Sequence, residues 1–522
     1  MSVSKMKKLL VVAPADSSEA IIKKLISLRC IDLRDFSECE EESLLQKKSY
    51  DAQISVINSK IQRIESVLLV LSKNVKKKAT LGEARVKVDR EAFISSGLYE
   101  DTCKFVEGFD VEAESIVCDA ATLQNVETLY DIEKTNLLAL ESMDKTAHSE
   151  SCTFICGWMP KKAQKGVEKV LDECLCAYEI TEPTSDDKPP VKLSNNVFTR
   201  CFEWITTEYT QPKYRSFDPT LIMSIFFFIA FGLMVSDVGY GLMLIPLGFI
   251  APVLLGTRGK HKNILNMLGI CGISSVIFGI LFGGWFGNMP YTLMDDFLWI
   301  HNALEVAPIF NGVIARPAQK PLIYLAIVLG FGALQIIVGM IIKFITLCKE
   351  GKAKDALLDI LPWWVIFAGI ALILTFNIIN VLVGLAVIIV GAVLIIIFGG
   401  RAYKGGKRFT KGCLSLCNIA RYLLNLAGYL KIFVVGLTFS VVTYYINVLG
   451  AIIGPTFGGY ALYILVSIVC HGIFFMLNVF VAHVIAKKIQ HNEFFAQFLC
   501  GGGDKFAAAE PSEKFTIEAS KK

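Results

Sequence analysis

The chain has 522 residues, of which 53% are hydrophobic, and its mean hydropathy is +0.52. Few soluble domains of this size are so apolar, so the composition argues against a purely soluble protein. The formal net charge is only +4, which gives no reason to expect a nucleic-acid partner. Residues 1–205 are rich in Lys, Glu, Asp and Ser, whereas long apolar runs dominate 219–490. The sequence therefore predicts a soluble domain followed by a membrane domain.

The soluble part contains two strand–helix–strand patterns with helical segments between them. The patterns cover 6–12, 17–28 and 30–33, and then 152–158, 161–171 and 176–180. A heptad seam is predicted from apolar residues at alternating spacings of three and four: Ile54, Ile57, Ile61, Ile64, Leu68 and Leu71. With a return helix over 121–143, we expect two small α/β lobes at the ends of a short antiparallel coiled coil. The alternative is an ordinary helical hairpin inside one globular domain.

Chemistry-bearing clusters are missing from the sequence pattern. There is no glycine-rich phosphate loop and no group of catalytic side chains, so we expect no active site and no cofactor. The 15 cysteines form no metal-like pairs with histidines, so we expect no metal site and reduced thiols throughout. The apolar stretch near the N-terminus is too short for a signal peptide, so the first domain is expected to be cytosolic. Segment 188–196 is a polar, proline-containing linker.

About 20 apolar residues cross a membrane core as a helix, and eight segments meet this condition. They lie near 219–236, 238–256, 264–286, 321–345, 357–376, 379–399, 422–450 and 459–486. Lys and Arg gather in the second, fourth and sixth loops, whereas loop 287–320 carries more acidic residues. This distribution predicts a multi-pass protein of the cell membrane with both ends in the cytoplasm. We divide the chain into a cytosolic α/β and coiled-coil domain (1–205), a membrane domain (206–500) and a cytosolic tail (501–522).

The seventh segment is unusual in length and charge. Between Tyr422 and Gly454 the only charged residue is Lys431. A continuous helix over these residues would be about 50 Å long, so it must tilt strongly in a core of about 30 Å. A lone lysine in such a segment is a functional candidate. The alternative is a lysine that extends to the cytosolic headgroups.

Several motifs together resemble one known family. They are CGWMP at 156–160, PPVKLSNN at 189–196, TEYTQPKYRSFDP at 207–219, FGLMVSDVGYG at 231–241, the Phe-Gly pairs at 278–287, and EFFAQFLCGGG at 493–503. The chain resembles, nearly end to end, the membrane subunit of V/A-type ATPases that is called I in bacteria and archaea and a in eukaryotes. The combination at 218–241 is the most specific part of this resemblance.

The resemblance implies a stator subunit that does not hydrolyse ATP. It forms two half-channels for H⁺ or Na⁺ against a rotor proteolipid ring. It also contacts E/G-type peripheral-stalk subunits and a C/d-type cap of the central stalk. A cation on the seventh helix attracts the ring carboxylate, displaces its ion and separates the half-channels. Lys431 and Lys488 stand here where the family has arginines, and a buried lysine, unlike arginine, can lose its proton.

The lysines leave three interpretations open. Lysine performs the family role, or the subunit is a divergent, weakly coupled or non-conducting stator, or another cation such as Arg421 takes the role. Candidate half-channel residues are Glu493, Tyr444, Tyr445, Asn447, His471, Asn478 and His483. For each polar residue in the last two spans, a satisfied interhelical hydrogen bond is the competing explanation. A secondary transporter is the alternative from another class, but the sequence shows no two-half repeat.

Overall fold

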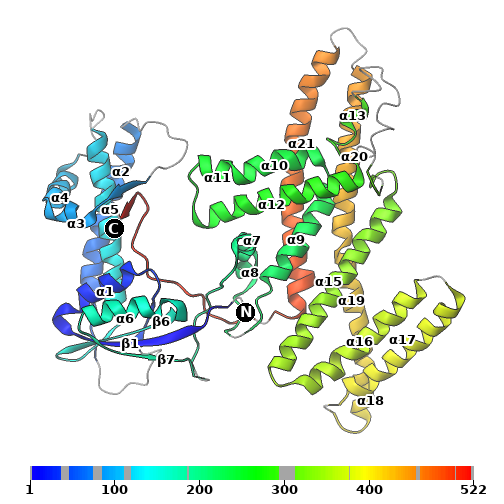
Figure 1. Ribbon diagram of the computed structural model, residues 1–522, viewed down its shortest axis with the longest axis horizontal. Coiled ribbons are helices and arrows are strands. Elements are labelled where there is room, and N and C mark those ends of the chain that lie inside the picture. Colours follow the sequence, from blue (N-terminus) through cyan, green and yellow to red (C-terminus); the bar gives the residue numbers. More distant parts are fainter. Residues whose placement is uncertain are drawn as a thin grey trace.

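The computed structural model shows an α/β body beside a helical body (Figure 1). It describes residues 3–36, 46–74, 85–110, 119–184, 187–214, 216–292, 312–314, 316–374, 377–401, 403–453, 459–499 and 501–518. The two bodies correspond to the polar and apolar parts of the sequence, and the exact domain boundaries stay a prediction.

Both strand–helix–strand patterns belong to one antiparallel sheet. Strand β1 (Met6–Pro14) pairs with β6 (Cys152–Pro160) on one side and with β7 (Ala177–Thr181) on the other. The expectation of two separate lobes built from these patterns is therefore wrong. The physical reason is that β1 and β6 pair along nine residues, which provides partners for their main-chain groups.

Shorter strands and two helices complete this sheet lobe. The additional strands are β2 (Asp32–Arg34), β3 (Gln46–Lys47) and β5 (Ala147–His148). Helices α1 (Ser18–Ser27) and α6 (Gln164–Glu173) place apolar residues in the core of the lobe. Cys156 in β6 is disulfide-bonded, so the expectation of reduced thiols is wrong at this residue.

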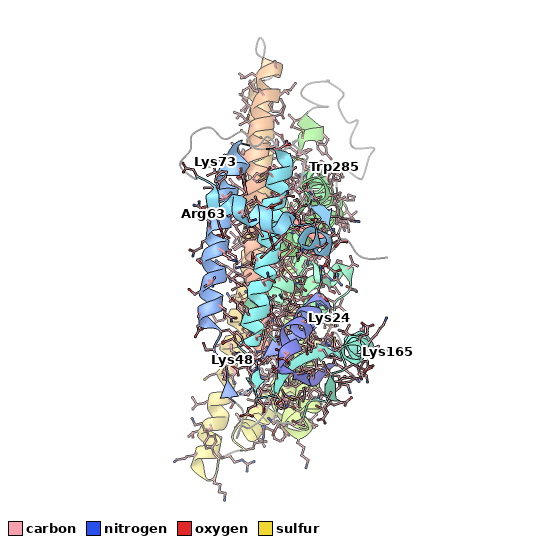
Figure 2. All side chains as sticks on the ribbon, turned by 90° about the vertical axis from the view of Figure 1, so that its left-hand side faces the viewer. Lys24, Lys48, Arg63, Lys73, Lys165 and Trp285 are labelled. Atoms are coloured by element: carbon pink, nitrogen blue, oxygen red, sulfur yellow. The ribbon has the colours of Figure 1, made fainter. Side chains whose placement is uncertain are left out.

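A helical hairpin rises from the sheet lobe. Helix α2 (Asp51–Asn74) packs antiparallel against α5 (Ala120–Met143), and Figure 2 shows the side chains along α2, with Arg63 and Lys73 labelled. The second half of the predicted seam is buried, from Ile61 to Leu71, and it packs against apolar residues of α5. The packed helix pair agrees with the seam, while coiled-coil geometry stays a prediction.

A small second lobe packs beside the middle of the hairpin, where Tyr99 donates a hydrogen bond to Glu133 of α5. It contains β4 (Val86–Val88), α3 (Arg90–Ser95) and α4 (Leu98–Gly108). Strand β4 pairs in parallel with β8 (Thr516–Glu518), which comes from the other end of the chain. Two short helices, α7 (Val197–Arg200) and α8 (Glu203–Tyr209), lead from the sheet lobe to the helical body.

Within the described residues, six helical segments are long and apolar enough to cross a membrane. They are Gly259–Phe282 (α12), Pro321–Lys349 (α15), Ala353–Ile373 (α16), Ile378–Gly399 (α17), Gly406–Gly450 and Ala461–Gln497. The first two predicted spans correspond to shorter apolar helices, Thr220–Val235 (α9) and Val238–Leu254. The second of these divides into α10 (Val238–Phe249) and α11 (Ala251–Leu254). The structure thus supports six spans, and a count of eight stays a prediction.

The division between the first two apolar helices lies at the predicted position. Ser236 ends α9 in the left-handed conformation, with φ of 36°. Asp237 then caps α10 by accepting a hydrogen bond from the Tyr240 amide at 3.0 Å. An aspartate at this position satisfies a helix N–H group that otherwise has no partner.

The predicted seventh helix is interrupted. Helix α18 (Gly406–Leu416) precedes α19 (Asn418–Gly428), and α20 (Leu430–Ile453) follows after the turn residue Tyr429. Gly406–Gly450 nevertheless forms one membrane-capable segment, so the predicted seventh segment is helical with a local break at Tyr429. Local 3₁₀-type hydrogen bonds cause the break, since the Tyr429 amide bonds the Leu426 carbonyl and the Ile432 amide bonds the Tyr429 carbonyl.

The last two long helices cross the α10–α12 hairpin at a steep angle. Helix α20 runs beside α21 (Gly459–Ile489), and Figure 1 shows both approximately perpendicular to α10 and α12. At 1.5 Å per residue the 31 residues of α21 span about 46 Å, well beyond a membrane core. In a membrane, at least one of these helix pairs would therefore tilt strongly, and the tilt of the last two helices stays a prediction.

Candidate functional site

Lys431 forms an ion pair with Glu493. Its Nζ lies 2.9 Å from Glu493 Oε1, although the two residues are 62 positions apart. Lys431 lies in the first turn of α20, immediately after the break at Tyr429. The Lys431 side chain is 44% exposed and that of Glu493 is 9% exposed. The ammonium group is thus within reach of an external partner, whereas the carboxylate is held inside.

A π-helical turn positions Glu493. It follows α21 over Gln490–Phe494, and such turns inside helices frequently occur at functional sites. Gln497 Nε2 donates a 2.6 Å hydrogen bond to the Glu493 carbonyl oxygen. Gly428 at the end of α19 leaves the space for the carboxylate, because a Cβ there would lie 2.2 Å from Glu493 Oε1. The close approach of α19 to Glu493 therefore requires glycine.

Buried polar groups surround this ion pair. Gln335 Nε2 of α15 donates to Gln490 Oε1 at 2.6 Å, and both side chains are fully buried. The remaining amide atoms of the two glutamines and the Tyr429 hydroxyl have no hydrogen-bond partner among the described residues. Unpaired polar groups are costly in an apolar interior unless water or an ion satisfies them. The cluster is suited to an ion path that reaches the ion pair.

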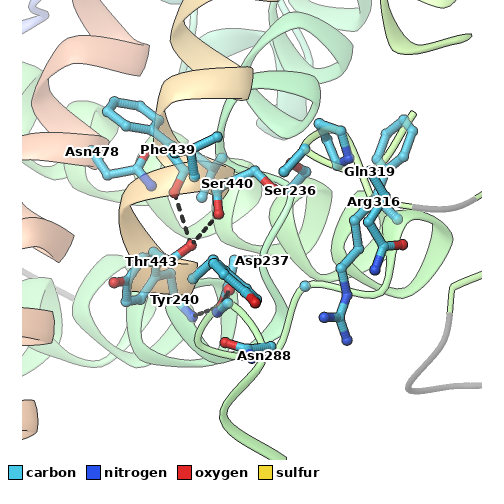
Figure 3. Close-up of a pocket in the computed structure, with 18 of the residues that line it drawn as sticks. Ser236, Asp237, Tyr240, Asn288, Arg316, Gln319, Phe439, Ser440, Thr443 and Asn478 are labelled. Carbon is cyan, nitrogen blue, oxygen red and sulfur yellow. Dashed lines mark hydrogen bonds between the residues drawn. The ribbon is translucent and has the colours of Figure 1, made fainter. Parts of the chain in front are cut away.

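A cavity of about 310 Å³ lies farther along α20 (Figure 3). Its polar lining comes from five parts of the chain and includes Ser236, Asp237, Asn288, Arg316, Gln319, Ser440, Thr443, Tyr444, Tyr445 and Asn478. Both amide atoms of Asn478 are buried and have no hydrogen-bond partner among the described residues. Ser440 follows Lys431 by nine positions, which corresponds to about 14 Å along a helix. The cavity is therefore distinct from the ion pair.

Asp237 forms one wall of the cavity and is held by main-chain groups. Besides the Tyr240 amide, its carboxylate accepts hydrogen bonds from the amides of Phe286 at 3.1 Å and Gly287 at 2.8 Å. The Asp237 carboxylate thus links α10 to the segment that follows α12. Hydrogen bonds of this kind stabilise an ionised carboxylate out of contact with water.

Two of the predicted lining residues, His471 and Asn447, differ from Asn478 because their side chains are hydrogen-bonded. His471 Nδ1 lies 2.8 Å from the Tyr240 hydroxyl, and its Nε2 lies 3.2 Å from Asn447 Oδ1. Asn447 Nδ2 donates to the Phe286 carbonyl oxygen at 2.6 Å. For His471 and Asn447 this network agrees with the competing explanation, which is hydrogen bonding between helices. His483 lies elsewhere, stacked on Trp204 at 5.7 Å between ring centroids.

The other predicted cations lie outside the ion pair. Lys488 is exposed near the end of α21, and no ion pair of its ammonium group occurs within the described part of the chain. Arg421 is exposed on α19, with its guanidinium 5.9 Å from the centre of the Tyr422 ring. The neighbouring Lys487 pairs with Glu208 of α8 at 2.8 Å, and this hydrogen bond lowers the pKa of Glu208. Lys431 is thus the candidate with a buried acidic partner.

Sequence reasoning missed several polar residues of the site. Gln335, Gln490, Asn288 and Arg316 were not predicted as site residues. Each of these residues belongs to a segment different from α20. No local pattern indicates which distant polar groups share one cavity, whereas the charge of Lys431 in an apolar run is visible in the sequence itself.

Comparison with known proteins adds evidence on the family. The sequence model of the V-type ATPase 116kDa subunit family matches residues 11–282. The A-type ATP synthase subunit I of Methanocaldococcus jannaschii is 26% identical over 416 residues, which cover 74% of this chain and 59% of that protein. The subunit I of Pyrococcus horikoshii is 30% identical over 368 residues, covering 67% of this chain and 52% of that protein.

A bacterial relative shows the same similarity. The V-type ATP synthase subunit I of Borreliella burgdorferi is 24% identical over 315 residues, which cover 56% of this chain and 49% of that protein. The chain spans about half to three fifths of the length of the relatives named here.

Proposed function

The chain belongs to the V-type ATPase 116kDa subunit family, and on that premise we propose that it is the ion-translocating stator subunit of a rotary ATPase. In this proposal Lys431 supplies the fixed positive charge that meets the carboxylates of a rotor proteolipid ring. ATP hydrolysis or synthesis takes place on other subunits. The observation that carries the proposal is the half-exposed ammonium group of Lys431, paired with a buried carboxylate in an otherwise apolar segment.

The surroundings of Lys431 support contact with a ring. Leu430 and Val434 on α20 are 38% and 56% exposed, and Phe480 on α21 is 66% exposed. Apolar side chains exposed on membrane helices suit lipid or another membrane protein. A positive charge on such a surface favours the ionised form of an approaching carboxylate and weakens its hold on H⁺ or Na⁺.

Glu493 offers a reason why a lysine can stand at position 431, where the family has an arginine. The carboxylate makes the Lys431 pair electrically neutral, which reduces the cost of a charge inside a membrane protein. A ring carboxylate would compete with Glu493 for the same ammonium group. In this mechanism Lys431 always has an acidic partner, either its own glutamate or that of the ring.

The two polar regions suggest two half-channels. The cavity around Asn478 lies toward the α20–α21 connection, and we assign it to the half-channel on the side opposite the cytosol. The cluster of Gln335 and Gln490 lies beside Glu493, and we assign it to the cytosolic half-channel. Lys431 stands between these regions and would prevent direct leakage from one to the other.

The proposed partners follow from the subunit's place in such a complex. They are the proteolipid ring, E/G-type peripheral-stalk subunits at the α2–α5 hairpin, a C/d-type cap of the central stalk, and H⁺ or Na⁺. The N-terminal domain and the C-terminus are proposed to face the cytoplasm.

Substitution of Lys431 tests the proposal. In the assembled complex reconstituted into vesicles, Lys431→Ala is expected to abolish ATP-driven ion transport, whereas Lys431→Arg is expected to retain or raise it. Lys487→Ala is the matched control, since it removes a nearby lysine that pairs with Glu208. Transport that persists in Lys431→Ala at the wild-type rate sinks the proposed role.

A non-conducting stator is the second candidate, and the Lys431–Glu493 pair itself favours it. If Glu493 holds the ammonium group permanently, ring carboxylates cannot use it. Wild-type complex would then assemble without transport, and Glu493→Gln would release the lysine and restore some transport. Transport by the wild type, lost in Lys431→Ala, decides for the conducting stator.

A further inference from the structure

The C-terminal segment 501–518, which we call the strap, joins the two bodies of the molecule. It begins after the end of α21, where η6 (Phe495–Gln497) follows the π-helical turn. Figure 1 shows it passing from the helical body along the sheet lobe to the middle of the hairpin. The sequence predicted only a cytosolic tail here.

The first half of the strap lies along the sheet lobe. Phe506 packs against Met6 and Trp158. The amide of Ala507 donates to Asp32 Oδ2 at 3.2 Å, and that of Ala509 donates to the Ile31 carbonyl oxygen at 2.9 Å. Two main-chain amides of the strap thus donate hydrogen bonds to the sheet lobe, and one aromatic ring is buried against it. Together these contacts fix the path of the strap.

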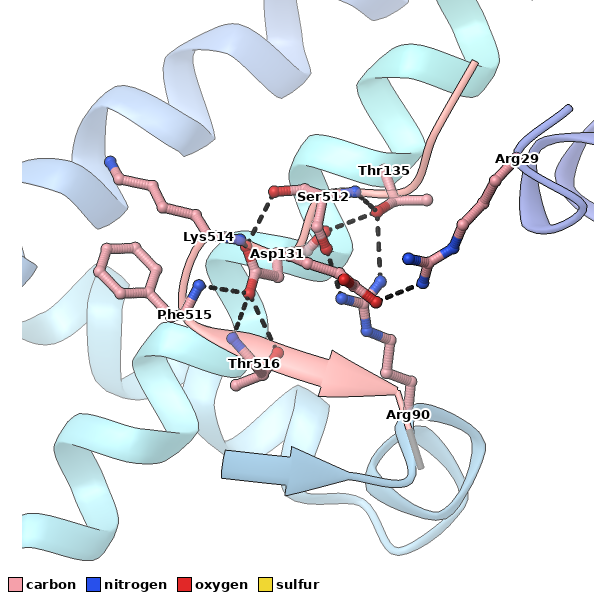
Figure 4. Close-up of polar contacts among 9 residues, drawn as sticks. Arg29, Arg90, Asp131, Thr135, Ser512, Lys514, Phe515 and Thr516 are labelled. Carbon is pink, nitrogen blue, oxygen red and sulfur yellow. Dashed lines mark hydrogen bonds and ion pairs between the residues drawn. The ribbon is translucent and has the colours of Figure 1, made fainter. Parts of the chain in front are cut away.

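The second half is bound by a buried carboxylate in the middle of α5. Asp131 is 0% exposed, and Figure 4 shows the strap folded around it. Its oxygens accept hydrogen bonds from the amides of Lys514 at 3.0 Å, Phe515 at 2.9 Å and Thr516 at 2.7 Å. The hydroxyls of Ser512 and Thr516 donate to it at 2.8 and 3.0 Å. Charge-assisted bonds of this kind are about twice as strong as neutral ones.

Further contacts surround Asp131. Thr135 Oγ1 accepts the Ser512 amide at 3.1 Å, and Arg90 donates to the Ser512 carbonyl oxygen. Arg29 of the sheet lobe pairs with Glu513 of the strap, and this hydrogen bond lowers the pKa of Glu513. Phe515 packs edge-on against Tyr130, and β8 completes the sheet with β4. The second lobe is thus built partly from the strap.

We infer that Asp131 and its surroundings form a binding socket for the chain's own C-terminus, and that the strap is a mechanical tether that fixes the hairpin relative to the helical body. The covalent connection between the two bodies is the segment between β7 and α7, and the strap adds a non-covalent attachment. A single linker leaves one body free to rotate relative to the other, whereas two attachments far apart remove that freedom. This inference does not depend on whether the subunit conducts ions.

Distance measurements between the bodies test the tether. Spin labels are placed through noncanonical amino acids at Leu69 on α2 and Leu414 on α18, which are 61% and 58% exposed. The full chain in lipid nanodiscs is expected to give one narrow distance distribution. Asp131→Asn, or deletion of residues 504–522, is expected to replace the narrow peak by a broad distribution.

Two controls separate tethering from loss of fold. Glu141→Gln changes an exposed acid on the same helix and is expected to keep the narrow peak. Glu513→Arg is expected to broaden it, and Arg29→Glu combined with Glu513→Arg is expected to restore it. A narrow peak that survives both the deletion and Asp131→Asn overturns the inference. Because no ion transport is measured, this outcome leaves the proposed function untouched.

Discussion

A lysine ammonium and a glutamate carboxylate meet where α19, α20 and the end of α21 converge. Their charged atoms lie 2.9 Å apart, and the lysine side chain is more exposed than the glutamate side chain. The Glu493 carboxylate is fixed by the π-helical turn, whereas the Lys431 ammonium group is the more accessible partner. A partner from outside can therefore approach the ammonium group without disturbing the acid. In the N-terminal domain the Lys7–Glu182 pair has the opposite asymmetry, with the lysine 14% and the glutamate 74% exposed.

The glycine beside the pair provides a residue-scale prediction. Gly428→Ala places a Cβ 2.2 Å from Glu493 Oε1, so the carboxylate or α19 must move. We expect a loss of about 1–3 kcal/mol in stability, as for overpacking in other cores, and reduced ion transport. Thermal unfolding of the purified protein and transport by the complex measure these effects.

The control for this prediction is Gly330→Ala on α15. A Cβ at Gly330 meets no atom within 4 Å, so this change adds a methyl group to a membrane helix without a clash. Equal melting temperatures for the two variants would show that the space beside Glu493 is not tightly filled.

At the scale of elements, the α2–α5 hairpin is held by a narrow apolar seam. Residues of α2 alternate between buried and exposed with helical periodicity, and the buried ones contact α5. Polar groups of α5 are also buried, because Asp131 binds the strap and Glu133 accepts a hydrogen bond from Tyr99. The hairpin is therefore stabilised by apolar packing on one face and by polar contacts on another.

Two leucines of α2 test the seam. Leu71 is fully buried, and Leu71→Ala is expected to cost roughly 2–5 kcal/mol, because the change leaves a cavity. Leu69 is 61% exposed, and Leu69→Ala is expected to change stability by about 0.5 kcal/mol or less. Hydrogen exchange of the α5 amides measures the difference, since opening of the hairpin exposes them. Equal exchange in both variants would contradict the seam.

At the scale of the whole molecule, the apolar helices and the strap place the two bodies in a fixed relation. The strap starts eight residues after Glu493 in the sequence and ends at the second lobe beside the hairpin. In a stator, force from the ring would reach the hairpin through this segment as well as through the linker. The arrangement thus connects the proposed ion path directly to the proposed stalk-binding element.

The predicted topology is testable by labelling from one side of the membrane. Cys417, which is exposed between α18 and α19, is expected to face the cytosol, and Val313, which is 78% exposed, the opposite side. With all other cysteines replaced, an impermeant maleimide added to intact cells is expected to label Val313→Cys but not Cys417. Permeabilised cells provide the control, because both positions should then react. Labelling of Cys417 in intact cells would reverse the assignment.

The sequence by itself determined the features that depend on short stretches of chain. Apolar runs predicted the membrane helices, the polar residues Ser236 and Asp237 divided the first two runs, and the motifs indicated the family. The unusual charge of Lys431 was also evident, because a lysine is conspicuous among apolar neighbours. These signals are local, so they need no knowledge of which distant surfaces meet.

Only the tertiary structure decided which distant segments pair. It joined β1 to β6 in one sheet, brought Glu493 to Lys431, and placed the strap on Asp131. In each case the partners are far apart in the chain, and many other polar or apolar residues offered equivalent chemistry. The choice among them depends on the packing of whole helices and strands, and no short stretch of sequence contains that information.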